Sequence, residues 1–124
     1  MENHIYAFEK LSVWEDIRTL NKMIYSLTAS FPDHEKFGLV SQLRRASISI
    51  GSNLAEGSTR TSSKDQAHFY QIAYSSSIEV LSQLVVSYDL NIITKGDYDQ
   101  VRDQIEKISY KLNSLRKSIL QRNT

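Results

Sequence analysis

The stretch YDQVRDQIEKISYKLNSLRKSI, residues 98–119, has the most regular hydrophobic pattern in the chain. Its apolar side chains recur at alternating steps of three and four residues, which places them on one stripe of an α-helix. Thr94 and Asp97, just before the stretch, predict where this helix opens. The stripe consists of Tyr98, Val101, Ile105, Ile108, Leu112, Leu115 and Ile119.

Upstream of this stretch, helical spacing predicts three more helices. We expect them at about residues 13–31, 34–57 and 64–90, with the last helix at about 95–120 and an N-terminal arm at 1–11. Short connections force consecutive helices to run antiparallel, and four helices with an apolar stripe each close around a shared core. The sequence therefore predicts one all-α domain over residues 1–124, an up-and-down antiparallel four-helix bundle.

Polar and turn-forming residues predict the helix ends. Ser12 with Glu15, and Ser63 with Gln66, have the spacing of a capping box, in which two orphan backbone donors are satisfied reciprocally. Gly57 follows the apolar stripe of the second helix, where glycine commonly caps a helix C-terminus. We expect each of these residues to mark a helix boundary.

The third predicted helix is apolar on two faces, so it has two partners to satisfy. The second face is expected to pack either on the N-terminal arm or on another subunit, and we favour the subunit. The first face contains Phe69, Ala73, Val80 and Leu84, and the second contains Tyr74, Ile78, Leu81, Val85 and Tyr88.

Small residues in the second and third helices predict a close seam between them. With the turn near Arg60, antiparallel pairing places residues opposite each other when their numbers add to about 120. Arg45 is then expected near Ser75, and Ser41 near Glu79. The two small patches, around Ser49 and Ser76, would face each other.

A tight seam buries polar side chains only if they have partners. Arg44 and Arg45 are the obvious partners for Asn53, Glu56 and Glu79. We interpret the two arginines as salt-bridge partners of Glu56 or Glu79, within a subunit or between subunits, with direct phosphate contact as the alternative. These five residues are our predicted structural or interface residues.

The run QLRRASISIGSNLAEG at 42–57 resembles the four-helix-bundle proteins encoded in intervening sequences of 23S ribosomal RNA genes. The resemblance implies a bundle that assembles as a homopentameric ring. It extends to the accessory proteins of diversity-generating retroelements, which share the architecture and bind nucleic acid. The chain departs from the family pattern at Gly51 and at Ser75-Ser76, where each residue stays small. Further matching residues are Val13-Trp14, Phe31-Pro32, Glu35, Gly38-Leu39, Phe69, Ile72-Ala73 and Glu79.

Composition and charge narrow the function classes. A net charge of +1 argues against a strongly basic protein that coats polyanions. The chain has no cysteine, which excludes disulfides and thiolate metal sites. It has no secretory segment and no apolar run of about 18 residues, so we expect a cytoplasmic protein with no membrane partner.

Enzymatic chemistry has few candidate residues. His4, His34 and His68 are too far apart in sequence to form a metal-binding pair, and the sequence has no glycine-rich phosphate loop. The serines have no histidine base at a recognisable spacing. We expect no metal, no cofactor and no catalytic site, and hence not an enzyme.

Nucleic-acid binding is the function that the charge placement favours, because every charged residue after Glu106 is a cation. Arg60 and Lys64 lie beside a predicted helix N-terminus, where backbone donors add to the side chains. The alternatives are a solvated last helix, or an oligomeric scaffold that binds another protein. The predicted nucleic-acid-binding residues, for RNA or DNA, are Arg60, Lys64, Lys107, Lys111, Arg116 and Lys117.

Overall fold

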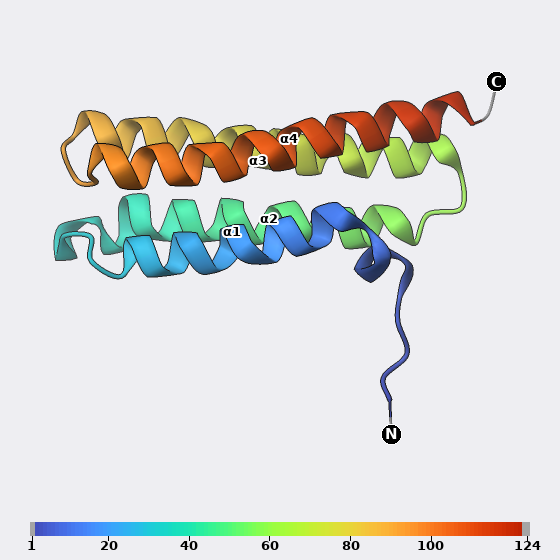
Figure 1. The fold of residues 1–124 in the computed structure, drawn as a ribbon, viewed down its shortest axis with the longest axis horizontal. Coiled ribbons are helices and arrows are strands. Elements are labelled where there is room, and N and C mark those ends of the chain that lie inside the picture. The colour runs from blue at the N-terminus through green and yellow to red at the C-terminus, as the bar shows by residue number, and fades with distance from the viewer. Residues whose placement is uncertain (1, 123–124) are drawn as a thin grey trace.

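The computed structural model describes residues 2–122 and contains four long helices (Figure 1). They are α1 (Ser12–Thr28), α2 (Ser41–Ser58), α3 (Ser63–Asp89) and α4 (Lys95–Gln121), and no strand occurs among residues 2–122. The 3-10 helix η1 (Ala7–Lys10) precedes α1, and the short η2 (Asp33–Glu35) and η3 (Lys36–Val40) connect α1 to α2. The predicted fold class, an all-α four-helix bundle, is confirmed.

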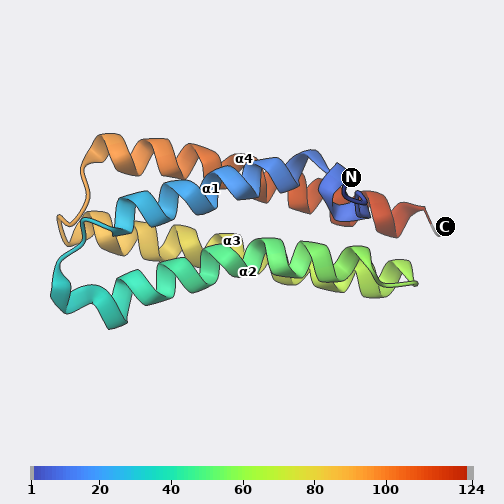
Figure 2. The same cartoon turned by 90° about the horizontal axis from the view of Figure 1, so that it is seen from below.

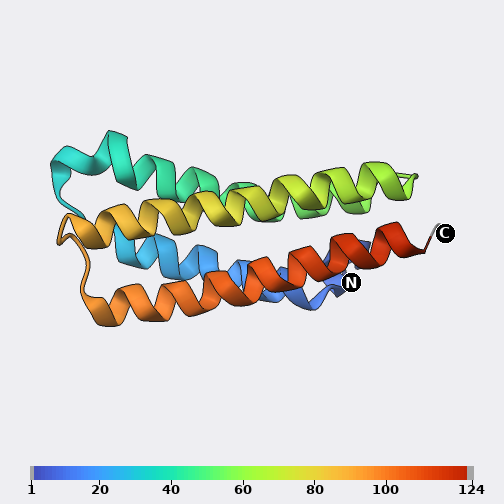
Figure 3. The ribbon, with the colours of Figure 1, turned by 90° about the horizontal axis from the view of Figure 1, so that it is seen from above.

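Each helix packs on two neighbours. α1 and α3 each contact both α2 and α4, and the views in Figures 2 and 3 show the four helices running side by side along one long axis. The predicted stripe of α4 is buried at Val101, Ile105, Ile108, Leu112 and Ile119. No helix within residues 2–122 combines the length and apolar character that crossing a bilayer requires.

Two predicted capping boxes are shifted by one residue. Leu11 is the N-cap of α1, without a side-chain bond, and Ser12 is already helical. Ser62 is the N-cap of α3, where its Oγ accepts a hydrogen bond from the Asp65 N–H at 3.1 Å. Thr94 caps α4 as predicted, and its Oγ1 accepts from the Asp97 N–H at 3.1 Å.

The connection between α1 and α2 is longer than predicted. α1 ends at Thr28 rather than near residue 31, and α2 begins at Ser41 rather than near residue 34. Gly38 causes the second difference, because its φ of −107° and ψ of −109° lie outside the helical region. The intervening residues form η2 and η3 instead of the first two turns of a continuous helix.

Gly57 does not cap α2, contrary to our expectation. It lies inside α2, which continues to Ser58, and its φ is not positive. A Cβ at this position would lie 2.8 Å from both Phe69 Cβ and Tyr70 Cε1. Glycine is therefore needed for the close approach of α2 and α3, rather than for the backbone conformation of a cap.

The second apolar face of α3 is shared between the core and the surface. Tyr74, Leu81 and Tyr88 pack against the core, and Tyr88 stacks on Tyr98 of α4 with 4.8 Å between ring centroids. Ile78 on the same face is 41% exposed. The N-terminal arm does not cover this face, because η1 packs on α1 and α2. Its occupancy by another subunit stays a prediction.

Candidate nucleic-acid interface

Hydrogen bonds fix the register of the seam between α2 and α3. Ser49 Oγ lies 3.0 Å from Ser76 Oγ, and Gln83 Nε2 donates to Gln42 Oε1 at 3.3 Å. The numbers of facing residues thus add to 125 rather than about 120. The small patches face each other as predicted, but the predicted proximity of Arg45 to Ser75 is wrong, because this register places Arg45 opposite Val80.

Asn53 has partners without either arginine. Its Nδ2 donates to the Ser49 carbonyl oxygen at 2.9 Å and to Ser49 Oγ at 3.0 Å. The half-buried amide is therefore satisfied within α2. This supports a structural role for Asn53.

Arg44 contacts α1 rather than Glu56 or Glu79, so the predicted salt bridge within one subunit is wrong for this residue. Its Nε donates to Thr28 Oγ1 at 2.9 Å, and its Nη2 donates to the Tyr25 carbonyl oxygen at 3.5 Å. The guanidinium carbon lies 4.5 Å from the centroid of the Tyr25 ring. Arg44 thus places a cation at the C-terminus of α1, where the last carbonyl groups have no intrahelical partner.

Arg45 is exposed and forms no ion pair with any residue of the described range 2–122. Glu56 pairs with Arg60 instead, at 2.9 Å. Glu79 accepts a hydrogen bond from Gln83 Nε2 at 3.4 Å. The predicted salt bridges within one subunit are therefore wrong for Arg45 as well, because Glu56 is paired with Arg60 and Arg45 is exposed on α2. A contact between subunits stays a prediction.

One end of the bundle gathers cations from three elements, and we call it the basic end. It comprises Arg60, Lys64, Lys117 and Arg122, which lie at the α2–α3 connection, the start of α3 and the end of α4 (Figure 1). Lys64 and Lys117 are exposed and form no ion pair with another residue of the described chain. These two predicted nucleic-acid-binding residues are thus brought together by the fold.

Arg60 is less available than predicted. Its guanidinium pairs with Glu56, lies 4.5 Å from the centroid of the Phe69 ring and is 40% exposed. Arg122 also lies near the start of α3. Burial raises the pKa of the Tyr70 hydroxyl, and the positive charge of Arg122 acts in the opposite direction.

Lys107 and Lys111 connect α4 to α1. Lys111 Nζ lies 2.6 Å from Asp16 Oδ2, and Lys107 Nζ lies 3.7 Å from Asp16 Oδ1. Arg116 donates from Nη2 to Asn113 Oδ1 at 2.9 Å and is half-buried. Of these three predicted nucleic-acid-binding residues, Lys111 has a mainly structural position, whereas Lys107 remains 51% exposed.

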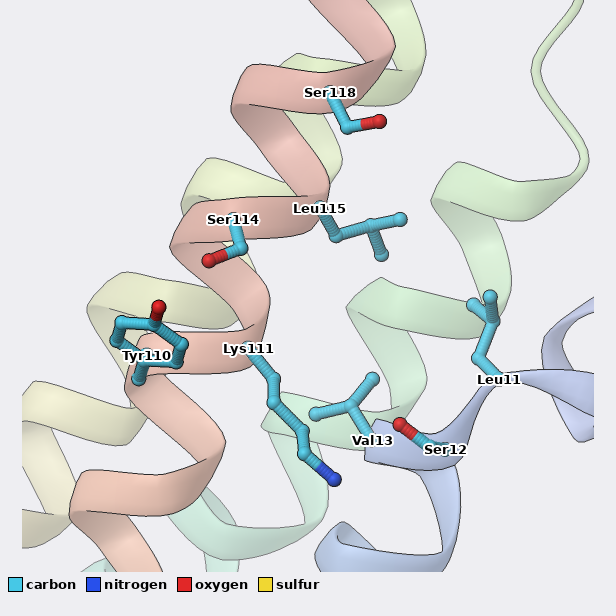
Figure 4. Close-up of a pocket in the computed structure, with 8 residues that line it drawn as sticks. All are labelled: Leu11, Ser12, Val13, Tyr110, Lys111, Ser114, Leu115 and Ser118. Carbon is cyan, nitrogen blue, oxygen red and sulfur yellow. The ribbon is translucent and has the colours of Figure 1, made fainter.

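A hollow of about 310 Å³ lies between α4 and the start of α1 (Figure 4). Leu11, Val13 and Leu115 contribute apolar surface to it. Tyr110 also lines the hollow and is 75% exposed. Sequence reasoning missed Tyr110, although its place outside the buried α4 stripe is a signal that could have found it.

The opposite end of the bundle is richer in acidic residues, although Lys36 and Lys95 also lie there. The α1–α2 and α3–α4 connections, with the adjoining helix ends, contain Asp33, Glu35, Asp89, Asp97 and Asp99. Of these, Asp99 pairs with Lys95 at 3.1 Å. Acidic residues thus predominate at this end, whereas the exposed lysines Lys64 and Lys117 lie at the basic end, which also contains Asp65.

The three histidines are dispersed, as the sequence indicated. His4 packs on Tyr6, His34 Nε2 lies 3.9 Å from Glu35 Oε2, and His68 packs on Phe69. Within residues 2–122, no group of three or more histidine, cysteine or acidic side chains has the placement that a metal ion needs.

Comparison with known proteins places these features in a family context. The family model for the 23S rRNA-intervening sequence protein matches residues 9–114. A crystal structure of a protein with unknown function from the S23 ribosomal protein family of Bacteroides thetaiotaomicron superposes with a TM-score of 0.76 at 22% identity. The similarity covers 85% of this chain and 98% of that chain, and at this identity it shows the fold alone. No curated protein matches the chain.

Proposed function

This chain belongs to the family of 23S rRNA-intervening sequence proteins, and from that premise we propose that it is a non-enzymatic, oligomeric protein of the cytoplasm that binds RNA or DNA. The binding surface of the proposal is the basic end. Phosphate groups are the ligand class, because cations and backbone donors recognise phosphates without reading the base sequence.

The observation that carries the proposal is the pair of exposed, unpaired lysines at the basic end. Lys64 lies in the first turn of α3, where backbone N–H groups and the helix dipole favour an anion. Lys117 lies near the C-terminus of α4, which reaches the same end (Figure 1). Two separate helices therefore present cations to one ligand surface.

Oligomerisation would make such a small patch effective. Each subunit contributes only a few cations, and the net charge of the chain is +1. In a ring the patches bind the same polyanion, so that individually weak contacts become avid. Exposed apolar side chains on α2, on α3 and directly after α3 support an assembly, and a pentamer is the state that the family resemblance favours. These side chains are Ile48, Ile78, Val86 and Leu90.

A protein-binding scaffold is the alternative function, and one residue favours it. Phe37 in η3 is 89% exposed. It lies at the α1–α2 connection, at the end of the bundle opposite to Lys64 and Lys117, and Lys36 Nζ lies 5.5 Å from the centroid of its ring. An exposed aromatic side chain is a typical anchor of a protein interface. In this alternative, the bundle contacts a partner protein through Phe37 and has no direct contact with nucleic acid.

Salt-dependent binding separates the two functions. We would measure binding of the wild type, of Lys64→Ala with Lys117→Ala, and of the control Lys22→Ala with Lys36→Ala to a labelled structured RNA by fluorescence anisotropy. The control removes the same charge from exposed lysines outside the basic end. Loss of one phosphate contact reduces the magnitude of the negative slope of log K against log salt by about 0.7–0.9.

We expect the first pair of substitutions to weaken binding about equally for unrelated sequences and to reduce this slope, because phosphate contacts contain no base information. The control double variant should bind the RNA more tightly than the double variant at Lys64 and Lys117. Equal binding by both double variants would refute the basic end as the interface. Absence of wild-type binding at low salt would favour the protein scaffold.

A further inference from the structure

Tyr110 is an exposed aromatic residue in the part of α4 where all charged residues are cations. Its side chain is 75% exposed, and residues 107–122 contain no aspartate or glutamate. It lies at the edge of the hollow between α4 and α1. Lys111 and Leu115 reach toward α1, whereas Tyr110 and Ser114 lie on the other side of α4 (Figure 4). Packing of the bundle therefore does not account for Tyr110.

Helical spacing aligns Tyr110 with two lysines. Residues three or four positions apart are neighbours on a helix surface, so Lys107, Tyr110, Ser114 and Lys117 share one face of α4. Lys107 is half-exposed, and its Nζ lies 3.7 Å from Asp16 Oδ1. Lys117 is exposed and has no ion-pair partner among residues 2–122. The tyrosine ring is thus flanked along the helix by cations on both sides.

Two of the acidic groups near this face are compensated by other cations, whereas Asp103, one turn before Lys107, is exposed and has no ion-pair partner among residues 2–122. Asp16 lies 2.6 Å from Lys111 Nζ, and Glu106 lies 3.0 Å from Arg102 Nε. These pairs reduce the repulsion that a polyanion would meet along this face. The face therefore offers an aromatic ring, a hydroxyl and two cations to a negatively charged ligand.

From this arrangement, we propose that Tyr110 stacks on an unpaired base of a single-stranded nucleic acid while Lys107 and Lys117 contact the adjoining phosphates. Stacking needs a base that is free of a duplex, and a flat exposed aromatic ring accepts any base. Lys107 and Lys117 lie about 15 Å apart along the helix axis, so the phosphates that they contact lie on either side of the stacked base. The inference rests on the proposed function and adds that single strands are preferred over duplexes.

The experiment compares Tyr110→Ala with Tyr110→Phe, which keeps the aromatic ring. Tyr6→Ala is the matched control, because Tyr6 is also exposed but lies in the N-terminal arm. Binding is measured by fluorescence anisotropy with three probes of one length: a single strand of mixed sequence, an abasic single strand and a duplex. Thermal unfolding followed by circular dichroism checks that each variant is folded.

We expect Tyr110→Ala to weaken binding of the normal single strand by about 5- to 150-fold, with an unchanged salt slope. Tyr110→Phe and Tyr6→Ala should bind it like the wild type, and the abasic strand should not distinguish Tyr110→Ala from the wild type. Unchanged single-strand binding by Tyr110→Ala, or an equal loss for the abasic strand, would overturn the stacking role and leave the proposed function intact. Absence of wild-type binding to all three probes would overturn both.

Discussion

Arg44 and Arg45 are adjacent in sequence but have different environments. Arg44 is half-buried against α1, where it contacts the Thr28 hydroxyl, the Tyr25 carbonyl group and the Tyr25 ring. Arg45 points to the surface and forms no ion pair with the rest of the described chain. Their positions one step apart on a helix, about 100° around the axis, account for this difference.

We expect Arg44→Ala to lower the free energy of unfolding by about 1–2 kcal/mol. The reason is that the C-terminus of α1 loses both a cation and hydrogen bonds to a charged group. Arg45→Ala should change this free energy by less than about 0.5 kcal/mol, as surface substitutions usually do. Urea unfolding followed by circular dichroism measures both. An equal loss for the two variants would contradict the environments described above, and dissociation by Arg45→Ala would support a contact between subunits.

The packing of α2 on α3 depends on residues that leave room for the neighbouring helix. The seam contains the Ser49–Ser76 pair in its middle, and Gly57 lies close to its end at the α2–α3 connection. Small side chains let two helix backbones approach, whereas an added methyl group must displace its neighbours. The packing of these two helices therefore depends on the distance between them rather than on the residue at which α2 ends.

Gly57→Ala tests this close approach, with Gly96→Ala as the control. The new Cβ would lie 2.8 Å from carbon atoms of Phe69 and Tyr70, so we expect overpacking to cost about 1–3 kcal/mol. At Gly96 the nearest heavy atom is Thr94 Oγ1 at 3.9 Å, so alanine fits there. That substitution should stabilise α4 by up to about 1 kcal/mol. Urea unfolding should therefore show a lower free energy of unfolding for Gly57→Ala and a higher one for Gly96→Ala. A stabilised Gly57→Ala protein would disprove the packing account.

The two ends of the bundle differ in charge, and part of its apolar surface is exposed. Lys64 and Lys117 lie at the basic end, whereas carboxylates predominate at the other end. Ile48 lines an apolar hollow of about 270 Å³ together with Trp14 and Phe8. An exposed apolar patch next to a hollow is typical of an interface between subunits.

We expect the purified protein to be a cyclic homo-oligomer, with a pentamer as the specific prediction. Ile78→Glu should shift the assembly toward monomer, because a carboxylate buried in an apolar contact has no partner. Thr61→Glu adds the same charge in the exposed α2–α3 connection and should leave the assembly intact. Multi-angle light scattering gives the mass of each variant. A concentration-independent wild-type monomer would exclude the ring and with it the multiplied basic patch.

The sequence alone determined the four helices, their approximate positions and the buried stripe of α4. These properties follow from local periodicity: a 3.6-residue repeat decides which side chains share a face, whatever the face later packs against. The cation-rich composition of residues 107–122 was equally visible. Gly38 limits this reasoning, because its non-helical backbone replaced the first turns of the predicted second helix.

Only the tertiary structure decided which side chains meet across helices. Pairing depends on the axial register and on the rotation of each helix, and the facing numbers add to 125 rather than about 120. The rotation of α2 leaves Arg45 exposed, while the packing of α1 gave Arg44 and Lys111 their actual partners. Tyr110 stayed exposed for the same reason, since the rotation of α4 that buries Ile108 and Leu112 points the intervening tyrosine toward solvent.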